Sequence, residues 1–136
     1  MDIEQAREFL NEHHHAVLVT RRKNGSVQTS PVLVGVDDEG RVIISSRETA
    51  YKVRHLRADP KVALCVFADT FFGHWIQIDG TADVLSLPDA MEPLVDYYRR
   101  VAGHHENWDD YRRAMEEDQR VLVRVTIEHV GPTRHG

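Results

Sequence analysis

The chain lacks several features on which whole classes of proteins depend. It has one cysteine, Cys65, in 136 residues, which excludes an intrachain disulfide and a cysteine-rich zinc site. Cys65 lies in the apolar run Val62–Phe67 and is expected to be a small buried residue, not a reactive thiol. No apolar run approaches the ~18 residues that a membrane helix needs, and the charged N-terminus is unlike a signal peptide. We therefore expect a cytoplasmic protein with no membrane partner.

Positive charge is also scarce. The chain has 17 Lys and Arg against 22 Asp and Glu, a formal net charge of -5. Nucleic-acid-binding domains carry a net basic footprint, so no nucleic-acid partner is expected, although a local anion site is compatible with this balance. The glycine-rich motifs of triphosphate-binding and dinucleotide-binding proteins are absent, and so is the Gly-x-Ser-x-Gly element of hydrolases. The length predicts one domain over residues 1–136.

Nine histidines are many for this length, and three of them are consecutive, at His13–His15. Metal ligands must converge on one point, whereas adjacent side chains point in different directions. Neither His-x-x-x-His nor His-Glu-x-x-His occurs. We expect no metal site.

One segment is basic within this acidic chain. It begins with two serines and holds four cations within residues 45–57: Ser45, Ser46, Arg47, Lys52, Arg54 and Arg57. Hydroxyls and the free N–H groups at a helix start can bind phosphate oxygens, while Lys and Arg neutralise their charge. A solvent-exposed connecting helix would have the same composition. The residues alone leave both interpretations open.

Hydrophobic periodicity predicts a mainly β (α+β) domain. The expected helices cover residues 2–12, with Asp2 as N-cap, 49–57, a segment that runs from a capping box at Asp89–Glu92 to Gly103, and one capped by Asn107. The expected strands cover residues 16–20, 27–36, 41–46, 61–68, 75–85 and 121–128. Six strands in mainly hairpin-type succession predict a small antiparallel barrel flanked by helices, with a frayed tail from Gly131.

Two strands carry finer signals. Pro31 indicates an edge strand or a bulge, and Gly80 indicates a bulge or a close backbone approach. Trp75 and Gln77 share one strand face. They could form an aromatic wall of a pocket, or Trp75 could simply cover the barrel end.

Five segments carry a resemblance to a known family over nearly the whole chain. They are Gln28–Val32, Lys52–Pro60, Gly80–Ala82, Tyr98–Met115 and Arg120–Leu122. The sequence resembles the split β-barrel flavin and deazaflavin oxidoreductases, the superfamily of pyridoxamine 5′-phosphate oxidase. The Lys-x-Arg-x-Leu-x-x-Asp-Pro motif is typical of that superfamily. The segment Tyr98–Met115 resembles its actinobacterial branch, whose enzymes use coenzyme F420, an 8-hydroxy-5-deazaflavin.

The resemblance implies a six-stranded split barrel and a homodimer with two cofactor sites at the subunit interface. It implies that Ser45, Arg47 and Lys52 hold the cofactor phosphate, that Ser46 also belongs to the cofactor site, and that Gln28, Ser30 and Pro31 lie beside the tricyclic ring. Some relatives have asparagine at the position of Pro31, so the backbone N–H of Val32 is the expected donor there. Trp75 and Gln77 lie on a strand that this family often uses at the interface.

The implied activity is hydride transfer from C5 of F420H2 to an unsaturated small-molecule acceptor. The protein would supply binding, orientation and electrostatics, and no residue is singled out as catalytic. One alternative is an FMN-binding oxidase of the pyridoxamine phosphate type, although the chain lacks the arginine-rich C-terminal segment typical of those enzymes. Another is a non-catalytic carrier or sensor of the cofactor.

Overall fold

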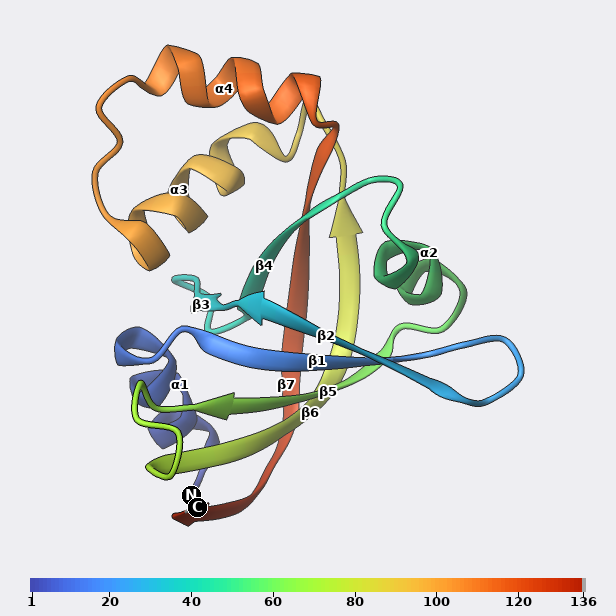
Figure 1. Ribbon diagram of the computed structural model, residues 1–136, viewed down its shortest axis with the longest axis vertical. Coiled ribbons are helices and arrows are strands. Elements are labelled where there is room, and N and C mark those ends of the chain that lie inside the picture. The colour runs from blue at the N-terminus through green and yellow to red at the C-terminus, as the bar shows by residue number, and fades with distance from the viewer. Residues whose placement is uncertain (136) are drawn as a thin grey trace.

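The computed structural model describes residues 1–135, and the side chains of residues 1–132. In chain order its elements are α1 Ile3–Glu12, β1 His15–Arg21, β2 Val27–Leu33, β3 Gly35–Val36, β4 Val42–Arg47, α2 Tyr51–Ala58, β5 Lys61–Phe67, β6 His74–Leu85, α3 Met91–Ala102, α4 Trp108–Glu117 and β7 Arg120–His135. Figure 1 shows α3 and α4 lying together at one end of the sheet and α1 near the other. None of the described helices is long and apolar enough to cross a membrane.

The strands form one antiparallel sheet in the order β2-β1-β5-β6-β7-β4-β3. Its two end strands, β2 and β3, are consecutive in the chain and separated only by Val34. The N–H of Val34 still donates to the carbonyl of His14 on the β1 side at 2.8 Å, whereas Gly35 already pairs with Ile43 of β4. The sheet therefore curls until its ends meet.

This change of partner corrects the predicted strand count. The single strand expected at 27–36 is two strands, so the described sheet has seven strands where six were predicted. The apolar run Val32–Val34 did not reveal the break, because side chains do not show which neighbouring strand the backbone pairs with. The predicted class, a mainly β antiparallel split barrel with flanking helices, is confirmed.

The barrel is split between β2 and the second half of β4. Among the described strands, β2 pairs only with β1, and residues 44–47 of β4 pair only with β7. Pro31 lies in β2, so its predicted edge position is confirmed. α2 follows β4 directly and covers the barrel next to this opening (Figure 1).

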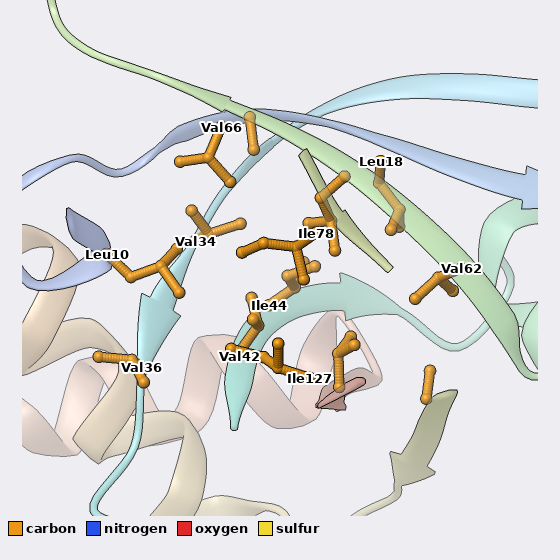
Figure 2. Close-up of a cluster of buried hydrophobic side chains, with 14 of the residues drawn as sticks. Leu10, Leu18, Val34, Val36, Val42, Ile44, Val62, Val66, Ile78 and Ile127 are labelled. Atoms are coloured by element: carbon orange, nitrogen blue, oxygen red, sulfur yellow. The ribbon is translucent and has the colours of Figure 1, made fainter. Parts of the chain in front are cut away.

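Apolar side chains from the inward faces of the strands fill the barrel. In Figure 2, Leu10 from α1 points toward Leu18, Ile44 and Ile78 from three strands, and each of these side chains is fully buried. Such a side chain contributes about 1.5–3 kcal/mol when it leaves water. A second cluster packs α3 onto the outer side of the sheet through Ile43, Leu94, Tyr97 and Leu122, which fixes α3 beside the split.

Two of the three predicted helix caps, those of Asp2 and Asn107, are present. The Asp2 capping box is present, because the Oδ1 of Asp2 accepts from the N–H of Gln5 at 2.8 Å and the Oε1 of Gln5 accepts from the N–H of Asp2 at 2.9 Å. Asn107 caps α4 through the N–H of Asp110 at 3.1 Å. The Asp89 cap is wrong: α3 begins at Met91 after Ala90, which has no side-chain cap. Ala90 is fully buried and its N–H donates to the carbonyl of Ser86, so a preceding turn displaces the helix start.

The predicted fraying of the tail is wrong for residues 131–135. These residues extend β7, because the long strand β6 begins at His74 and gives them a partner; Gly136 lies outside the described residues. The predicted irregularity at Gly80 is confirmed by a register shift between Asp79 and Gly80. Cys65 is half-buried on the outward face of β5, not enclosed in the core.

Candidate functional site

A groove of about 720 Å³ lies at the split of the barrel. Its volume falls within the range of ligand pockets, roughly 300–1,000 Å³. Six elements and the α3–α4 loop line it, through Pro31, Val32, Leu33, Ser45, Lys52, Tyr97, Tyr98, His105, Asp110, Tyr111, Ala114, Met115 and Arg120. Cations lie toward α2 and β7, and aromatic side chains belong to α3, α4 and their loop.

Two positively charged side chains, Lys52 and Arg120, line the groove, and the nearby carboxylates do not neutralise both of them. Lys52 is half-buried, and its pKa is lowered first by burial and then by the nearby positive charge of Arg120. Among residues 1–132 no carboxylate lies within ion-pair distance of Lys52. The Nε of Arg120 is buried without a hydrogen bond, and its nearest carboxylate oxygen is that of Asp118 at 3.6 Å. An anionic group would relieve this repulsion.

The position of Lys52 follows from how α2 is anchored. Val53 and Leu56 are buried at 1% and 2% exposure, and His55 Nδ1 lies 3.2 Å from the hydroxyl of buried Thr20. Lys52 is the second residue of the helix, and the N-cap Ala50 offers no side-chain oxygen to the first-turn amides. The N–H of Val53 donates to the carbonyl of Ala50 at 3.1 Å, so the N–H groups of Tyr51 and Lys52 are the ones that remain available to an anion.

The other cations of the basic run have different surroundings. Arg57 binds both carboxylate oxygens of Glu48, at 2.5 and 3.0 Å. Arg54 lies over the ring of Tyr51 on the exposed side of α2. Arg47 lies outside the groove lining, 3.9 Å from Asp118. Only Lys52 of the four lines the groove.

Aromatic residues form the opposite wall. The Tyr97 hydroxyl donates to the carbonyl of Leu33 at 2.9 Å, and the Tyr111 hydroxyl donates to the carbonyl of Leu94 at 2.7 Å. Burial raises the pKa of both hydroxyls, that of Tyr111 to about 12. Tyr98 packs edge-to-face on Tyr111, with ring centroids 5.1 Å apart. The hydroxyls of Tyr97 and Tyr111 are therefore held by hydrogen bonds and are neutral at ordinary pH.

Four predicted site residues meet in the groove: Pro31, Val32, Ser45 and Lys52. Gln28, Ser30 and Ser46 do not line it. Gln28 and Ser30 lie opposite Thr20 and Leu18, on the inward face of the sheet. The hydroxyl oxygens of Ser30 and Ser46 are buried and lack a hydrogen-bond partner among the described residues.

Trp75 and Gln77 lie on the outward face of β6, away from the groove lining. Trp75 lines a separate apolar cleft of about 290 Å³ with Cys65, Phe67, Phe71 and Phe72. Gln77 donates to Asp79 at 3.3 Å.

This outward face extends to the edge of the groove. Two rows of opposed residues cross four strands: Leu33, His15, Phe67 and Trp75, and beside them Pro31, Val17, Cys65 and Gln77. Residues that face each other across neighbouring strands share a face of the sheet. Because Pro31 and Leu33 also line the groove, anything covering this face would border the groove as well.

Sequence reasoning did not assign a site role to Arg120, Tyr97, His105 or Tyr111. The resemblance over Tyr98–Met115 and Arg120–Leu122 indicates the family but gives these residues no role of their own. The structure shows that these two segments, far from Lys52 in the chain, supply the second cation and the aromatic wall.

The donor set fits a flat ring that carries an anionic group. Lys52, Ser45 and Arg120 can hold the anion, and the first-turn amides of α2 can assist. The aromatic and apolar side chains of β2, α3 and α4 can contact the ring. Among the described residues, no three His, Cys, Asp or Glu side chains gather closely enough to hold a metal ion.

Comparison with known proteins agrees with this arrangement. The family model described as pyridoxamine 5'-phosphate oxidase matches residues 3–134. A conserved hypothetical protein from Mycobacterium tuberculosis has a similar structure, with a TM-score of 0.77 and 21% identity over 96% of this chain and 82% of that one. A structure titled F420 reductase has a TM-score of 0.71 and 19% identity over 92% of this chain and 94% of that one. A putative pyridoxamine 5'-phosphate oxidase from Listeria innocua has a TM-score of 0.68 and 14% identity over 95% of each chain.

These structural likenesses show the fold, and the family model covers nearly all of the sequence. The chain belongs to the pyridoxamine 5'-phosphate oxidase family.

Proposed function

We propose that this protein is an F420H2-dependent reductase that transfers a hydride to an unsaturated organic acceptor in the cytoplasm. The observation that carries the proposal is the groove at the barrel split, with two insufficiently paired cations at one end and an aromatic wall at the other. The similar structure titled F420 reductase supports the choice of cofactor.

The residues divide into two groups in this proposal. Lys52, Arg120 and Ser45 bind the phosphate, with Arg47 reaching it from the rim. The segment Pro31–Leu33 and the ring of Tyr98 enclose the flat ring system. When bound, a reduced deazaflavin supplies a hydride at its C5 position. The protein positions that atom and excludes water.

An FMN-dependent oxidase is the second candidate. The family description and the Listeria innocua structure, named as a putative pyridoxamine 5'-phosphate oxidase, favour it. Both cofactors carry a phosphate, so the cationic end of the groove does not discriminate between them.

A titration of the purified protein with F420 and, separately, with FMN tests the proposal. We expect F420 to bind at least about tenfold more tightly, a difference of about 1.4 kcal/mol, with quenching of its fluorescence. Tighter FMN binding would favour the oxidase, and binding of neither would refute the cofactor site. F420 binding without oxidation of F420H2 by any acceptor would indicate a carrier or sensor.

We also propose that the protein is a homodimer that buries the outward face of β1, β5 and β6. Exposed apolar side chains support this, since Phe71 and Phe72 are 77% and 73% exposed beside the Trp75 cleft. A large exposed apolar patch often marks an interface. The continuity of this face with Pro31 and Leu33 would place the groove at the subunit boundary.

Light scattering after gel filtration tests the dimer. We expect the native protein to have twice the mass of one chain and Phe72→Asp to shift it toward the monomer. Tyr51→Asp is the matched control, since Tyr51 is 67% exposed on α2, outside this face. A monomeric native protein would refute the dimer.

A further inference from the structure

The orientation of His105 in the groove is fixed by its own loop. The backbone N–H of Asn107 donates to His105 Nδ1 at 2.9 Å. A ring nitrogen that accepts a hydrogen bond carries no proton, so the neutral ring holds its proton on Nε2. The two ring nitrogens point in nearly opposite directions, and Nε2–H therefore points away from the loop backbone.

Three aromatic rings hold the imidazole in place. Its centroid lies 5.2 Å from that of Tyr98, and 5.6 Å from those of both Trp108 and Tyr111. His105 is half-buried and lines the groove. Its Nε2 makes no hydrogen bond with the described part of the chain.

Most neighbouring polar groups at this end are already engaged. The hydroxyls of Tyr97 and Tyr111 donate to backbone carbonyls, and Asp110 accepts from Arg113 at 2.8 Å. The Tyr98 hydroxyl is the competing donor, since it has no partner among the described residues, but it rotates freely about its C–O bond. His105 Nε2–H has a direction set by the fold.

We propose that His105 positions the acceptor substrate by donating its Nε2–H to an oxygen conjugated with the double bond that is reduced. This inference rests on the proposed reductase function and adds a positioning residue to it, with an α,β-unsaturated carbonyl compound as the acceptor. The hydride adds to the β-carbon, and the electron pair of the double bond moves toward the carbonyl oxygen. Water then protonates the α-carbon, and the proton that the deazaflavin loses on oxidation neutralises the hydroxide that remains. The acceptor gains one hydride and one proton, and the deazaflavin is oxidised by two electrons.

The hydrogen bond strengthens as negative charge develops on the oxygen, so it favours the transition state over the ground state. A neutral donor of fixed direction also needs no reorganisation during the reaction.

The first test uses the cofactor-free protein with 15N-labelled histidine. We expect the NMR spectrum to show His105 protonated on Nε2, and 2-cyclohexen-1-one to shift that Nε2 resonance. Cyclohexene, which has the double bond without the oxygen, should leave it unchanged. Protonation on Nδ1, or no shift with 2-cyclohexen-1-one, would overturn the proposal.

The second test uses variants loaded with F420H2 and the same enone. His105→Gln keeps an N–H donor near the position of Nε2 and should retain kcat/KM within about threefold. His105→Phe keeps the aromatic packing but removes the donor, and should lose at least about tenfold, the effect of one hydrogen bond to a developing charge. Equal activity of His105→Phe and the native enzyme would overturn the role of His105.

His104→Phe is the matched control: it replaces the neighbouring histidine, which does not line the groove, and should retain near-native kcat/KM. A large loss in Tyr98→Phe with none in His105→Phe would assign the donor to Tyr98. The F420 affinity of each variant distinguishes a failure of the proposed function from a failure of the role of His105. Failure of the native protein to bind F420 refutes the proposed function, whereas intact binding with no effect of His105 refutes this inference alone.

Discussion

Replacing Lys52 with alanine tests the anion site at its centre. Lys52 lines the groove, is half-buried, and has no carboxylate partner among the described residues. A hydrogen bond between charged groups contributes about 1.5–3 kcal/mol. Lys52→Ala should therefore raise the Kd for F420 by about tenfold to about 150-fold.

The same change should leave folding intact. Lys52 makes no hydrogen bond or ion pair with a described side chain, and Arg120 repels it. The free energy of unfolding of the cofactor-free protein should change by less than about 0.5 kcal/mol, as at other positions without specific contacts. Urea unfolding measures this directly.

Arg54→Ala is the matched control for the Lys52 variant. It removes one positive charge from the same helix, but Arg54 is exposed and does not line the groove. Its Kd for F420 should stay within about threefold of the native value at physiological salt, where distant surface charges are screened. Equal losses of F420 affinity in both variants would mean that the positive charge of α2 acts from a distance, without a specific anion site at Lys52. An unchanged Kd in folded Lys52→Ala would refute the anion site.

Further consequences concern pH and packing. The pKa of Lys52 lies below 10.5 because of burial and then because of the nearby positive charge of Arg120. Since only the protonated lysine attracts phosphate, F420 affinity should fall as pH rises through that lowered pKa, by up to about tenfold per pH unit. This fall should vanish in Lys52→Ala. Gly80→Ala should destabilise the fold by at least about 1–3 kcal/mol in urea unfolding, because its Cβ would overlap the carbonyl oxygen of Thr126. Tyr111→Phe should cost about 1–3 kcal/mol by leaving the Leu94 carbonyl unpaired. In the native protein the Tyr111 pKa is raised from 10.0 to about 12, so folding stability should fall between these pH values, and Tyr111→Phe should reduce this fall to the part that the raised pKa of Tyr97 causes.

The sequence predicted most elements because their apolar periodicity is strong. In β6, Ile76 and Ile78 are buried and Trp75 and Gln77 face outward, as alternation requires. The miss at Val34 has a different cause. The N–H of Val34 still bonds toward β1, and Gly35 already pairs with β4. Strand pairing uses backbone groups, so the side chains of a single sequence do not show which neighbour a segment pairs with.

The site was predictable to the extent that it is local. Ser45 and Lys52 flank the junction of β4 and α2 and could be recognised together. Arg120 could not, because it comes near them only through the pairing of β4 with β7, which sets Arg47 opposite Arg120. A single sequence does not reveal which strands pair.

The number of cations in the basic run also says little about where a phosphate binds. Arg57 is neutralised by Glu48, and Arg47 and Arg120 share Asp118 at 3.9 and 3.6 Å. Lys52 is left with a cation as its nearest charged neighbour in the groove. An anion gains most where positive charge is least compensated and partly removed from water. The arrangement of carboxylates around the run, more than the run itself, therefore directs a phosphate to Lys52.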